Sequence, residues 1–270
     1  IKVIPVTARV GAEIEGVDLS KPMDDQTFEE VHKALTEHCV IFFRRQDLDH
    51  ESHKAFGRRF GELHVHPAIP GPEGHPEILP IHTDKNSTYI AGERWHSDVS
   101  CDEEPPLGAI LYLKTVPEYG GDTLFSNMYA AYEALSDRMK DYLLGLTARH
   151  DGAPQYRGRY SNLGVDDAGK AYPFADHPIV RTHPVSGRKC LFVNPIFTTR
   201  INDVPRLESD SILRMLHEHC ASADFQVRFR WQPGSVAFWD NRCVQHLAIW
   251  DYYPNVRSGF RVTVKGDRPA

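Results

Sequence analysis

Two side chains that commonly bind metal ions lie two residues apart in the stretch GERWHSDVS, residues 92–100, where Ser97 separates His96 from Asp98. If this segment is extended, alternate side chains point to the same side, so the imidazole and the carboxylate could bind one ion. His246, at the start of a later β-rich run, is the strongest candidate for a third ligand. Taken alone, the short motif could also be a polar turn, in which His96 packs and Asp98 caps a neighbouring segment.

Two histidines and one carboxylate are the ligand set that holds non-haem iron(II) and leaves three coordination positions open. Those positions would accept a chelating co-substrate and dioxygen. Zinc could use the same three ligands for hydrolysis. The three residues by themselves therefore leave both chemistries open.

Two arginines follow the third candidate ligand, at Arg257 and Arg261. If residues 257–264 form a strand, both arginines lie on the same face, together with Gly259 and Thr263. Arginines on the inward face of a barrel are costly unless each meets an anion. A guanidinium suits a carboxylate, sulfonate or phosphate, so one arginine could hold a keto acid and the other an acidic substrate. Alternatively, both pair with Asp or Glu on the barrel surface.

The elements that must position these side chains are mostly strands. Apolar, β-rich or alternating runs predict strands at 8–18, 39–44, 108–114, 123–126, 189–193, 225–231, 235–239, 246–250 and 259–265, with a short one near EILPI (77–81). Capping aspartates predict helices after residues 24 and 49, and further helices are expected near 127–145 and 208–220.

This pattern predicts a mainly β fold with flanking helices, built on a jelly-roll or cupin-like core. No repeat or linker divides the chain, so we expect a single domain over residues 1–270. Two irregular stretches, 64–94 and 151–178, are long for loops in a compact domain. They are either active-site loops or surface insertions.

Composition narrows the function classes. The net charge of −6 does not suggest a protein that binds nucleic acid, because such proteins usually carry a basic surface. No apolar run is long enough to span a membrane. The five cysteines are odd in number and widely spaced, which is typical of reduced thiols. With no signal peptide visible, we expect a cytoplasmic protein, and we also expect a homo-oligomer.

Several motifs, in this order along the chain, resemble the taurine dioxygenase family of iron(II)- and 2-oxoglutarate-dependent oxygenases. They are WHSDVSCDEEPPLGAILYL, VPEYGGDTLFSNMYAAYEAL, VNPIFTTRI and FWDNRCVQH, followed by Arg257 and Arg261. The family also contains alkylsulfatases and aryloxyalkanoate dioxygenases. The resemblance extends from about residue 8 to the end. It implies a double-stranded β-helix core, iron(II) as the metal, and 2-oxoglutarate and O₂ as co-substrates.

The resemblance also implies a role for each site residue. His96, Asp98 and His246 match the iron ligands, and no further catalytic residue is implied. Thr123 and Arg257 match the positions that hold the distal carboxylate of 2-oxoglutarate. His66 and Arg261 match the positions that bind the sulfonate of taurine.

Two departures bear on the substrate. Where taurine dioxygenases have a Tyr three residues beyond the matching His, this chain has Ile69, and where they have an Asn near the bound amine, it has Gly92. The anion end of the pocket is retained, so we expect a small organic anion with a more apolar body than taurine. Candidates are a sulfonate, a sulfate, or an aryloxy or alkyl carboxylate. A zinc hydrolase and a non-catalytic cupin-like binding protein remain as alternatives.

Overall fold

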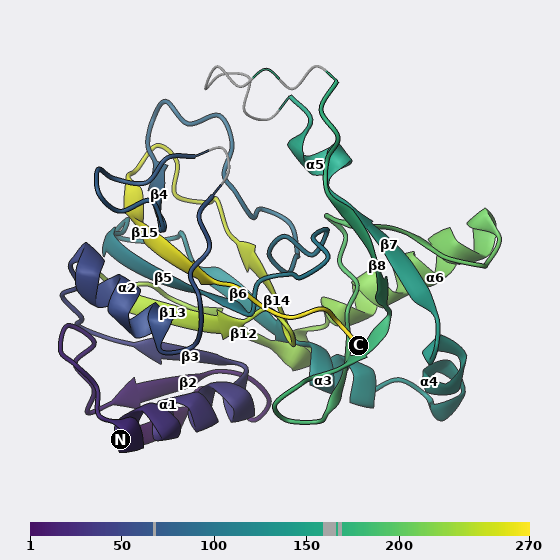
Figure 1. Cartoon of the computed structure of the whole chain (residues 1–270), viewed down its shortest axis with the longest axis horizontal. Coiled ribbons are helices and arrows are strands. Elements are labelled where there is room, and N and C mark those ends of the chain that lie inside the picture. Colours follow the sequence, from purple (N-terminus) through teal and green to yellow (C-terminus); the bar gives the residue numbers. More distant parts are fainter. Residues whose placement is uncertain (67–68, 159–165, 167–168) are drawn as a thin grey trace.

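The computed structural model describes residues 1–66, 69–158, 166 and 169–270, and it confirms a mainly β fold with few helices (Figure 1). The largest sheet has seven strands, in the order β1-β2-β3-β13-β5-β15-β4. Their bounds are β1 Lys2–Pro5, β2 Ala12–Glu15, β3 Val40–Phe43, β13 Ser235–Asp240, β5 Gly108–Thr115, β15 Arg257–Val264 and β4 Ile78–Thr83. All neighbouring pairs are antiparallel except β2 and β3, which are parallel.

Three smaller sheets accompany it. The first has the order β12-β6-β14, with β12 Gln226–Phe229, β6 Thr123–Asn127 and β14 Val244–Ala248. The second has the order β11-β7-β8, with β11 Thr198–Ile201, β7 Thr147–Asp151 and β8 Phe174–Pro178. The third pairs β10 Lys189–Leu191 with β9 Val180–Thr182.

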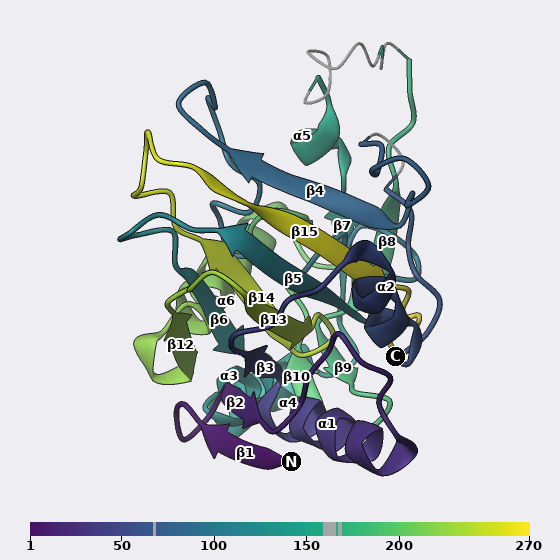
Figure 2. The ribbon, with the colours of Figure 1, turned by 90° about the vertical axis from the view of Figure 1, so that its left-hand side faces the viewer.

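The helices are α1 Asp25–His38, α2 His50–Arg58, α3 Met128–Glu133, α4 Asp137–Leu143, α5 Ala153–Tyr156 and α6 Arg206–Cys220, with a 3₁₀ turn at Ala223–Phe225. The predicted caps of the first two are confirmed. Asp24 accepts a hydrogen bond from the Thr27 N–H, and Asp49 forms a capping box with Ser52. Figure 2 shows α2 in front of the large sheet and α1 near its lower edge, and side chains of both helices belong to the outer core.

Strand alternation divides the apolar side chains between two cores. On β3, Phe42 packs inward with Phe125 of β6, while the adjacent Phe43 packs outward under α2. On β5, Leu111 belongs to the inner core and Ile110 to the outer core. Both faces of these strands are therefore buried, which explains why they appear as uninterrupted apolar runs in the sequence.

Some predicted elements are wrong. The opening strand predicted at 8–18 is shorter, because only β2 (Ala12–Glu15) lies in this range and Gly11, with a φ of +85°, turns the chain just before it; β1, on the other side of this turn, was not predicted. The helix at 127–145 is two helices, since Ser136 caps a new helix by accepting from the Met139 N–H. Strands β7, β8, β9 and β11 were not predicted, and β8 lies within the expected loop 151–178.

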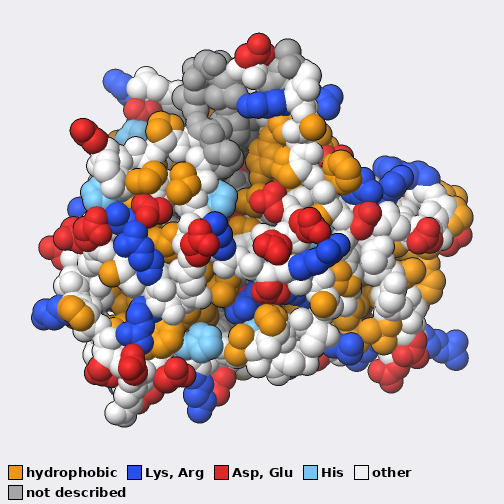
Figure 3. All heavy atoms as spheres, viewed as in Figure 1, with side chains coloured by type: hydrophobic (Ala, Val, Ile, Leu, Met, Phe, Trp, Pro, Cys, Tyr) orange, Lys and Arg blue, Asp and Glu red, His pale blue; other side chains and the backbone are white. Residues whose placement is uncertain are grey.

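Other expectations from the composition can be compared with the structure. All five cysteines are buried and free, so none forms a disulfide framework. Within the described part of the chain, no helix is long and apolar enough to cross a bilayer. On the face drawn in Figure 3, basic and acidic side chains are interspersed and do not gather in a patch of one sign.

Candidate metal centre

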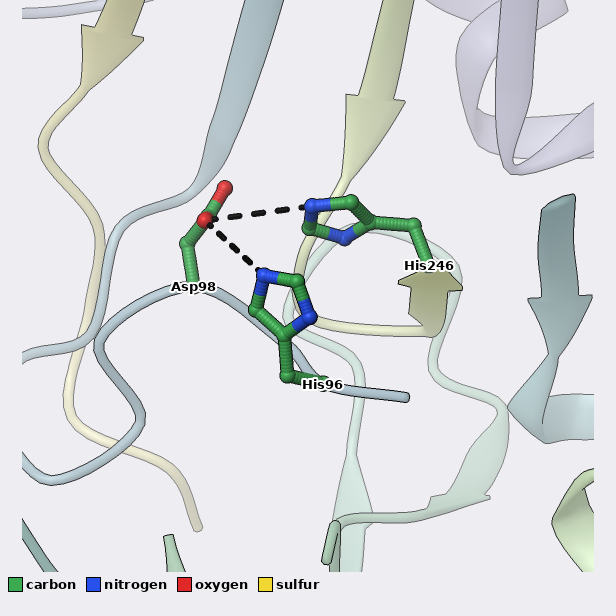
Figure 4. A group of neighbouring side chains, drawn as sticks. All are labelled: His96, Asp98 and His246. Atoms are coloured by element: carbon green, nitrogen blue, oxygen red, sulfur yellow. Dashed lines mark ion pairs between the residues drawn. The ribbon is translucent and has the colours of Figure 1, made fainter. Parts of the chain in front are cut away.

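The three predicted ligands meet at one point. The Nε2 atoms of His96 and His246 lie 3.7 and 3.9 Å from the same oxygen, Oδ1 of Asp98. Figure 4 shows this oxygen facing both imidazoles. All three residues are buried, and their ligand atoms lie within 4.8 Å of one another.

The backbone explains why residues so far apart in the sequence converge. His96 and His246 form an isolated antiparallel bridge, in which each main-chain N–H donates to the other's carbonyl at 3.1 and 2.8 Å. The Ser97 hydroxyl donates to the Val244 carbonyl at 2.9 Å, which directs this side chain away from the site. The chain turns at Asp98, so only a short extended segment places His96 and Asp98 on one side.

The donor set fits a divalent metal ion. Nδ1 of His96 lies 2.8 Å from the Arg94 carbonyl oxygen. Because a carbonyl only accepts hydrogen bonds, Nδ1 carries the proton, and the lone pair of Nε2 is available to bind a metal ion. Burial, with His96 nearby, holds the pKa of His246 well below its usual range, so this ring is neutral, as a ligand must be. Three ligand atoms that each lie about 2.1 Å from one ion would be about 3 Å apart from one another. Side-chain movements of roughly 1 Å would therefore bring these three atoms to metal-binding distances.

Asp98 is also in the form that a metal requires. Burial would raise the pKa of its carboxyl group, but Arg261 and the two histidines together hold that pKa well below the usual value. The carboxylate is therefore ionised at neutral pH. The Arg261 guanidinium donates to Oδ1 of Asp98 at 3.1 Å, so the substrate-binding candidate contacts the metal-ligand carboxylate directly.

Arg257 is a buried cation that lines the same cavity as the three candidate ligands. Its Nε donates to the Gly121 carbonyl at 3.1 Å, its Nη2 lies 3.5 Å from the Thr123 hydroxyl, and its guanidinium lies over the Trp231 ring. Among the described residues, no carboxylate lies within ion-pair distance of it. Burial lowers the pKa of Arg257 from its usual value, because removing the guanidinium from water disfavours its charged form.

The glycines of the GGDT motif make room for this arginine. Gly121 has a φ of +71°, and a Cβ at this position would lie 3.2 Å from Cδ of Arg257 and 3.2 Å from the Tyr252 ring. The Gly121 N–H is held by the Asp251 carboxylate at 2.8 Å. The tight turn therefore wraps around Arg257 and presents a carbonyl to it.

One cavity of about 460 Å³ connects all the predicted site residues, His66, His96, Asp98, Thr123, His246, Arg257 and Arg261. Arg257, Arg261 and Thr263 of β15 all line it, so the expected common face of this strand is confirmed. The His66 ring accepts the Ile69 N–H at Nδ1, so its other nitrogen carries the proton. Burial lowers the pKa of His66 to about 4 and keeps the ring neutral.

Part of the cavity lining is apolar. Ile69 and Gly92, the two departures seen in the sequence, both line the cavity. A Cβ on Gly92 would lie 2.9 Å from Cε1 of His96, so this glycine permits the close approach of the ligand ring. The apolar lining is completed by Leu79, Ile81, Ile90, Leu111, Ile196 and Phe197.

The long irregular stretches contribute unequally to this cavity. Much of its lining comes from 64–92, whereas 151–178 contributes Gln155 and Tyr156 among the described residues. Residues 67–68, 159–165 and 167–168 of these stretches lie outside the described part of the chain. That the two stretches act as active-site loops stays a prediction.

Three residues around the site were missed in the sequence. Trp231 donates its indole N–H to the Thr123 hydroxyl at 3.0 Å. His64 lines the cavity, and its spacing of two from His66 in LHVHP was the available signal. Asn241, which lies in the stretch FWDNRCVQH, contacts Asp98.

Known proteins resemble this chain over its whole length. The family model described as taurine catabolism dioxygenase TauD, TfdA family, matches residues 2–263. An α-ketoglutarate-dependent sulfate ester dioxygenase of Pseudomonas putida is 34% identical, over all of this chain and 91% of that protein.

Solved structures extend the likeness to the fold. The crystal structure of a taurine dioxygenase from Burkholderia xenovorans has a TM-score of 0.86 and 36% identity, covering all of this chain and 92% of the other. That of AAD-2 in complex with Mn(II) and N-oxalylglycine has a TM-score of 0.81 and 28% identity, covering 99% and 98%. The chain therefore belongs to the TauD, TfdA family of taurine catabolism dioxygenases.

Proposed function

We propose that the protein is an iron(II)- and 2-oxoglutarate-dependent dioxygenase that hydroxylates a small organic anion and releases succinate and CO₂. His96, Asp98 and His246 would hold the iron, on a core that we take to be a double-stranded β-helix. Iron bound there would activate O₂, the oxidant, so that one oxygen atom enters the C–H bond and the other enters succinate as 2-oxoglutarate loses CO₂. The family, with its α-ketoglutarate-dependent relative, supports this activity.

Arg257 is the single observation that carries the proposal. It is only 6% exposed, lines the same cavity as the three ligands, and has no carboxylate partner among the described residues. A buried guanidinium of this kind requires an anion from outside the chain. The distal carboxylate of 2-oxoglutarate meets that need, with Thr123 beside it as a second polar contact.

The protein's own residues would then orient the reactants. Arg257 and Thr123 fix the far end of a flexible diacid, so that its keto-acid end is directed at the ligand cluster. The AAD-2 complex supports a 2-oxoglutarate co-substrate, because N-oxalylglycine carries the same two terminal carboxylates as 2-oxoglutarate. The apolar residues of the lining, among them Ile69, Ile90 and Phe197, would favour an apolar substrate body and exclude water from it.

Succinate formation tests the proposal directly. Metal-free protein supplied with iron(II), ascorbate and 2-oxoglutarate should release succinate, and a panel of sulfonates, sulfate esters and aryloxy or alkyl carboxylates should raise the rate. A zinc hydrolase or a non-catalytic binding protein would need no keto acid and would release none. Hydrolysis of a panel member by the zinc-loaded protein, without succinate, would replace the proposal with the hydrolase alternative.

The anionic group of the substrate is assigned to Arg261 and His66. Both line the cavity, and the P. putida relative and the Burkholderia structure are named for a sulfate ester and for taurine, a sulfonate. The neutral His66 ring can donate one hydrogen bond, while Arg261 supplies the charge. Because Ile69 and Gly92 stand where taurine dioxygenases have polar residues, and both line the cavity, we expect alkyl sulfonates, alkyl sulfates or aryloxyalkanoates to outperform taurine.

Replacing Arg261 with Ala should lower kcat/KM for an acidic substrate about 10- to 100-fold, since a hydrogen bond to a charged group is lost. The comparison is the same variant assayed on the neutral amide or ester of that substrate, which should be little affected. Because Arg261 also contacts Asp98, equal loss on both substrates would mean that the residue serves the metal site. Equal loss, or no loss on either, would reopen the substrate class.

A further inference from the structure

We infer that Asn241 is a positioning residue that makes Asp98 a ligand through one oxygen only. The inference rests on the proposed metal centre. Asn241 is 2% exposed and lies in the turn between β13 and β14. Its side chain contacts Asp98 twice. Its Oδ1 accepts the Asp98 main-chain N–H at 3.2 Å, and its Nδ2 donates to Oδ2 of Asp98 at 3.3 Å.

The orientation of this amide is fixed by a second donor. The indole N–H of Trp239 donates to Oδ1 of Asn241 at 3.0 Å, so this atom receives two N–H groups and must be the oxygen. The nitrogen then has to face Asp98. Trp239 also packs against the His246 ring, with centroids 4.6 Å apart, so one side chain supports both Asn241 and a metal ligand.

The two oxygens of Asp98 consequently have different surroundings. Oδ1 faces Nε2 of His96, Nε2 of His246 and the Arg261 guanidinium, at 3.7, 3.9 and 3.1 Å. Oδ2 is the oxygen that accepts from Asn241. A hydrogen bond from a neutral amide to Oδ2 restrains rotation of the carboxylate, which would otherwise bring both oxygens to the metal.

The turn that carries Asn241 is held rigidly by its neighbours. The Asp240 carboxylate accepts from the Arg242 main-chain N–H, from Nε and Nη2 of Arg242, and from Nε2 of His183, at 2.7 to 3.0 Å. His183, Asp240 and Cys243 also form a second group with metal-binding side chains. Because the Asp240 carboxylate already accepts four hydrogen bonds, we infer that His183, Asp240 and Cys243 stabilise the turn and do not bind a metal.

Binding through one oxygen matters for the proposed reaction. Two histidines and a one-oxygen carboxylate leave three positions on a six-coordinate ion, enough for a chelating keto acid and dioxygen. A carboxylate bound through both oxygens would occupy one of these positions. Asn241 therefore preserves the position that dioxygen needs, without touching either reactant.

The test measures metal binding rather than turnover. Metal-free wild type and the Asn241→Ala variant are titrated with Co(II) in the absence of 2-oxoglutarate. The variant should bind Co(II) about 10- to 100-fold more weakly, as is usual when a group that supports a ligand is removed. The visible absorption spectrum of bound Co(II) should also change, because Oδ2 of Asp98 is no longer held by the amide and the carboxylate is not fixed in one orientation. Asn241→Ser, which retains a hydroxyl, should lose less affinity.

Asn127→Ala is the matched control. Asn127 is also buried, at 4% exposure, and also makes three side-chain hydrogen bonds, to the N–H groups of Tyr129 and Ala130 and to the Arg9 carbonyl. It should lose stability but keep wild-type Co(II) affinity and spectrum. If Asn241→Ala does not fold, Asn241→Ser is compared with the control in the same way.

The outcomes separate this inference from the metal centre on which it rests. Co(II) affinity within twofold of wild type, an unchanged spectrum, or the same loss in Asn127→Ala would overturn the role of Asn241. Asp98→Ala is titrated in parallel. If that variant binds Co(II) as tightly as wild type, the proposed metal centre itself is wrong.

Discussion

Replacing His246 with Ala should abolish both iron binding and succinate formation. The variant leaves two ligands, His96 and Asp98, which lie close together on one short loop and cannot enclose an ion from a third side. The imidazole is buried against Phe125 and Trp239, so no mobile side chain can replace it. Iron content, measured after loading and desalting, should fall from near one per chain to background, and metal-dependent stabilisation against heat should disappear.

His53→Ala is the control for this variant. His53 is equally buried, at 1% exposure, but its ring bonds to the Ile110 carbonyl under α2, in the outer core. Its loss should lower the melting temperature and leave iron content unchanged. Near-stoichiometric iron in His246→Ala would show that the ligand set is misassigned.

Two of the three candidate ligands could be found because their geometry is local: His96 and Asp98 need only a short extended segment. His246 lies 150 residues further along the chain, and it was indicated by its β-rich run and by its place among the ordered family motifs. The common face of Arg257 and Arg261 likewise follows from the two-residue period of a strand. These features depend on neighbours in the chain, which a pattern of residue types can reveal.

Features that depend on distant partners were not predictable in the same way. The contact between Asn241 and Asp98 joins positions 143 residues apart, and nothing local in WDN signals it. Strand β7 has the sequence TARHD, which lacks an apolar alternation, and it exists because β8 and β11 pair with it on either side. In such strands, pairing with neighbouring strands outweighs the weak β-propensity of the residues themselves.

The direct contact between Arg261 and Asp98 was also missed. From the sequence, the two arginines of β15 look equivalent, four residues apart on one face. In the structure Arg261 has a carboxylate partner at 3.1 Å, whereas Arg257 has only a carbonyl, a hydroxyl and an aromatic ring. This difference makes Arg257 the stronger evidence for an external anion.

Arg257→Ala should raise the 2-oxoglutarate concentration needed for half-maximal activity about 100-fold. A charge-assisted, two-point contact with a carboxylate contributes a few kcal/mol, and each 1.36 kcal/mol is about tenfold in affinity. Arg257→Lys should restore little of this, because an ammonium group cannot form the paired contact or lie flat over Trp231. Iron content should remain at the wild-type level, which separates this variant from His246→Ala.

Ligand-induced stabilisation provides a measurement of the same effect that does not depend on turnover. At a 2-oxoglutarate concentration about 100 times the wild-type Kd, wild type should gain about 2.7 kcal/mol of unfolding free energy, and a variant with 100-fold weaker binding only about 0.4 kcal/mol. Arg228→Ala is the matched control. Arg228 pairs with Asp122 near the same turn, but its side chain is 55% exposed and does not line the cavity. This control should keep the full gain, and a full gain in Arg257→Ala as well would show that the anion binds elsewhere.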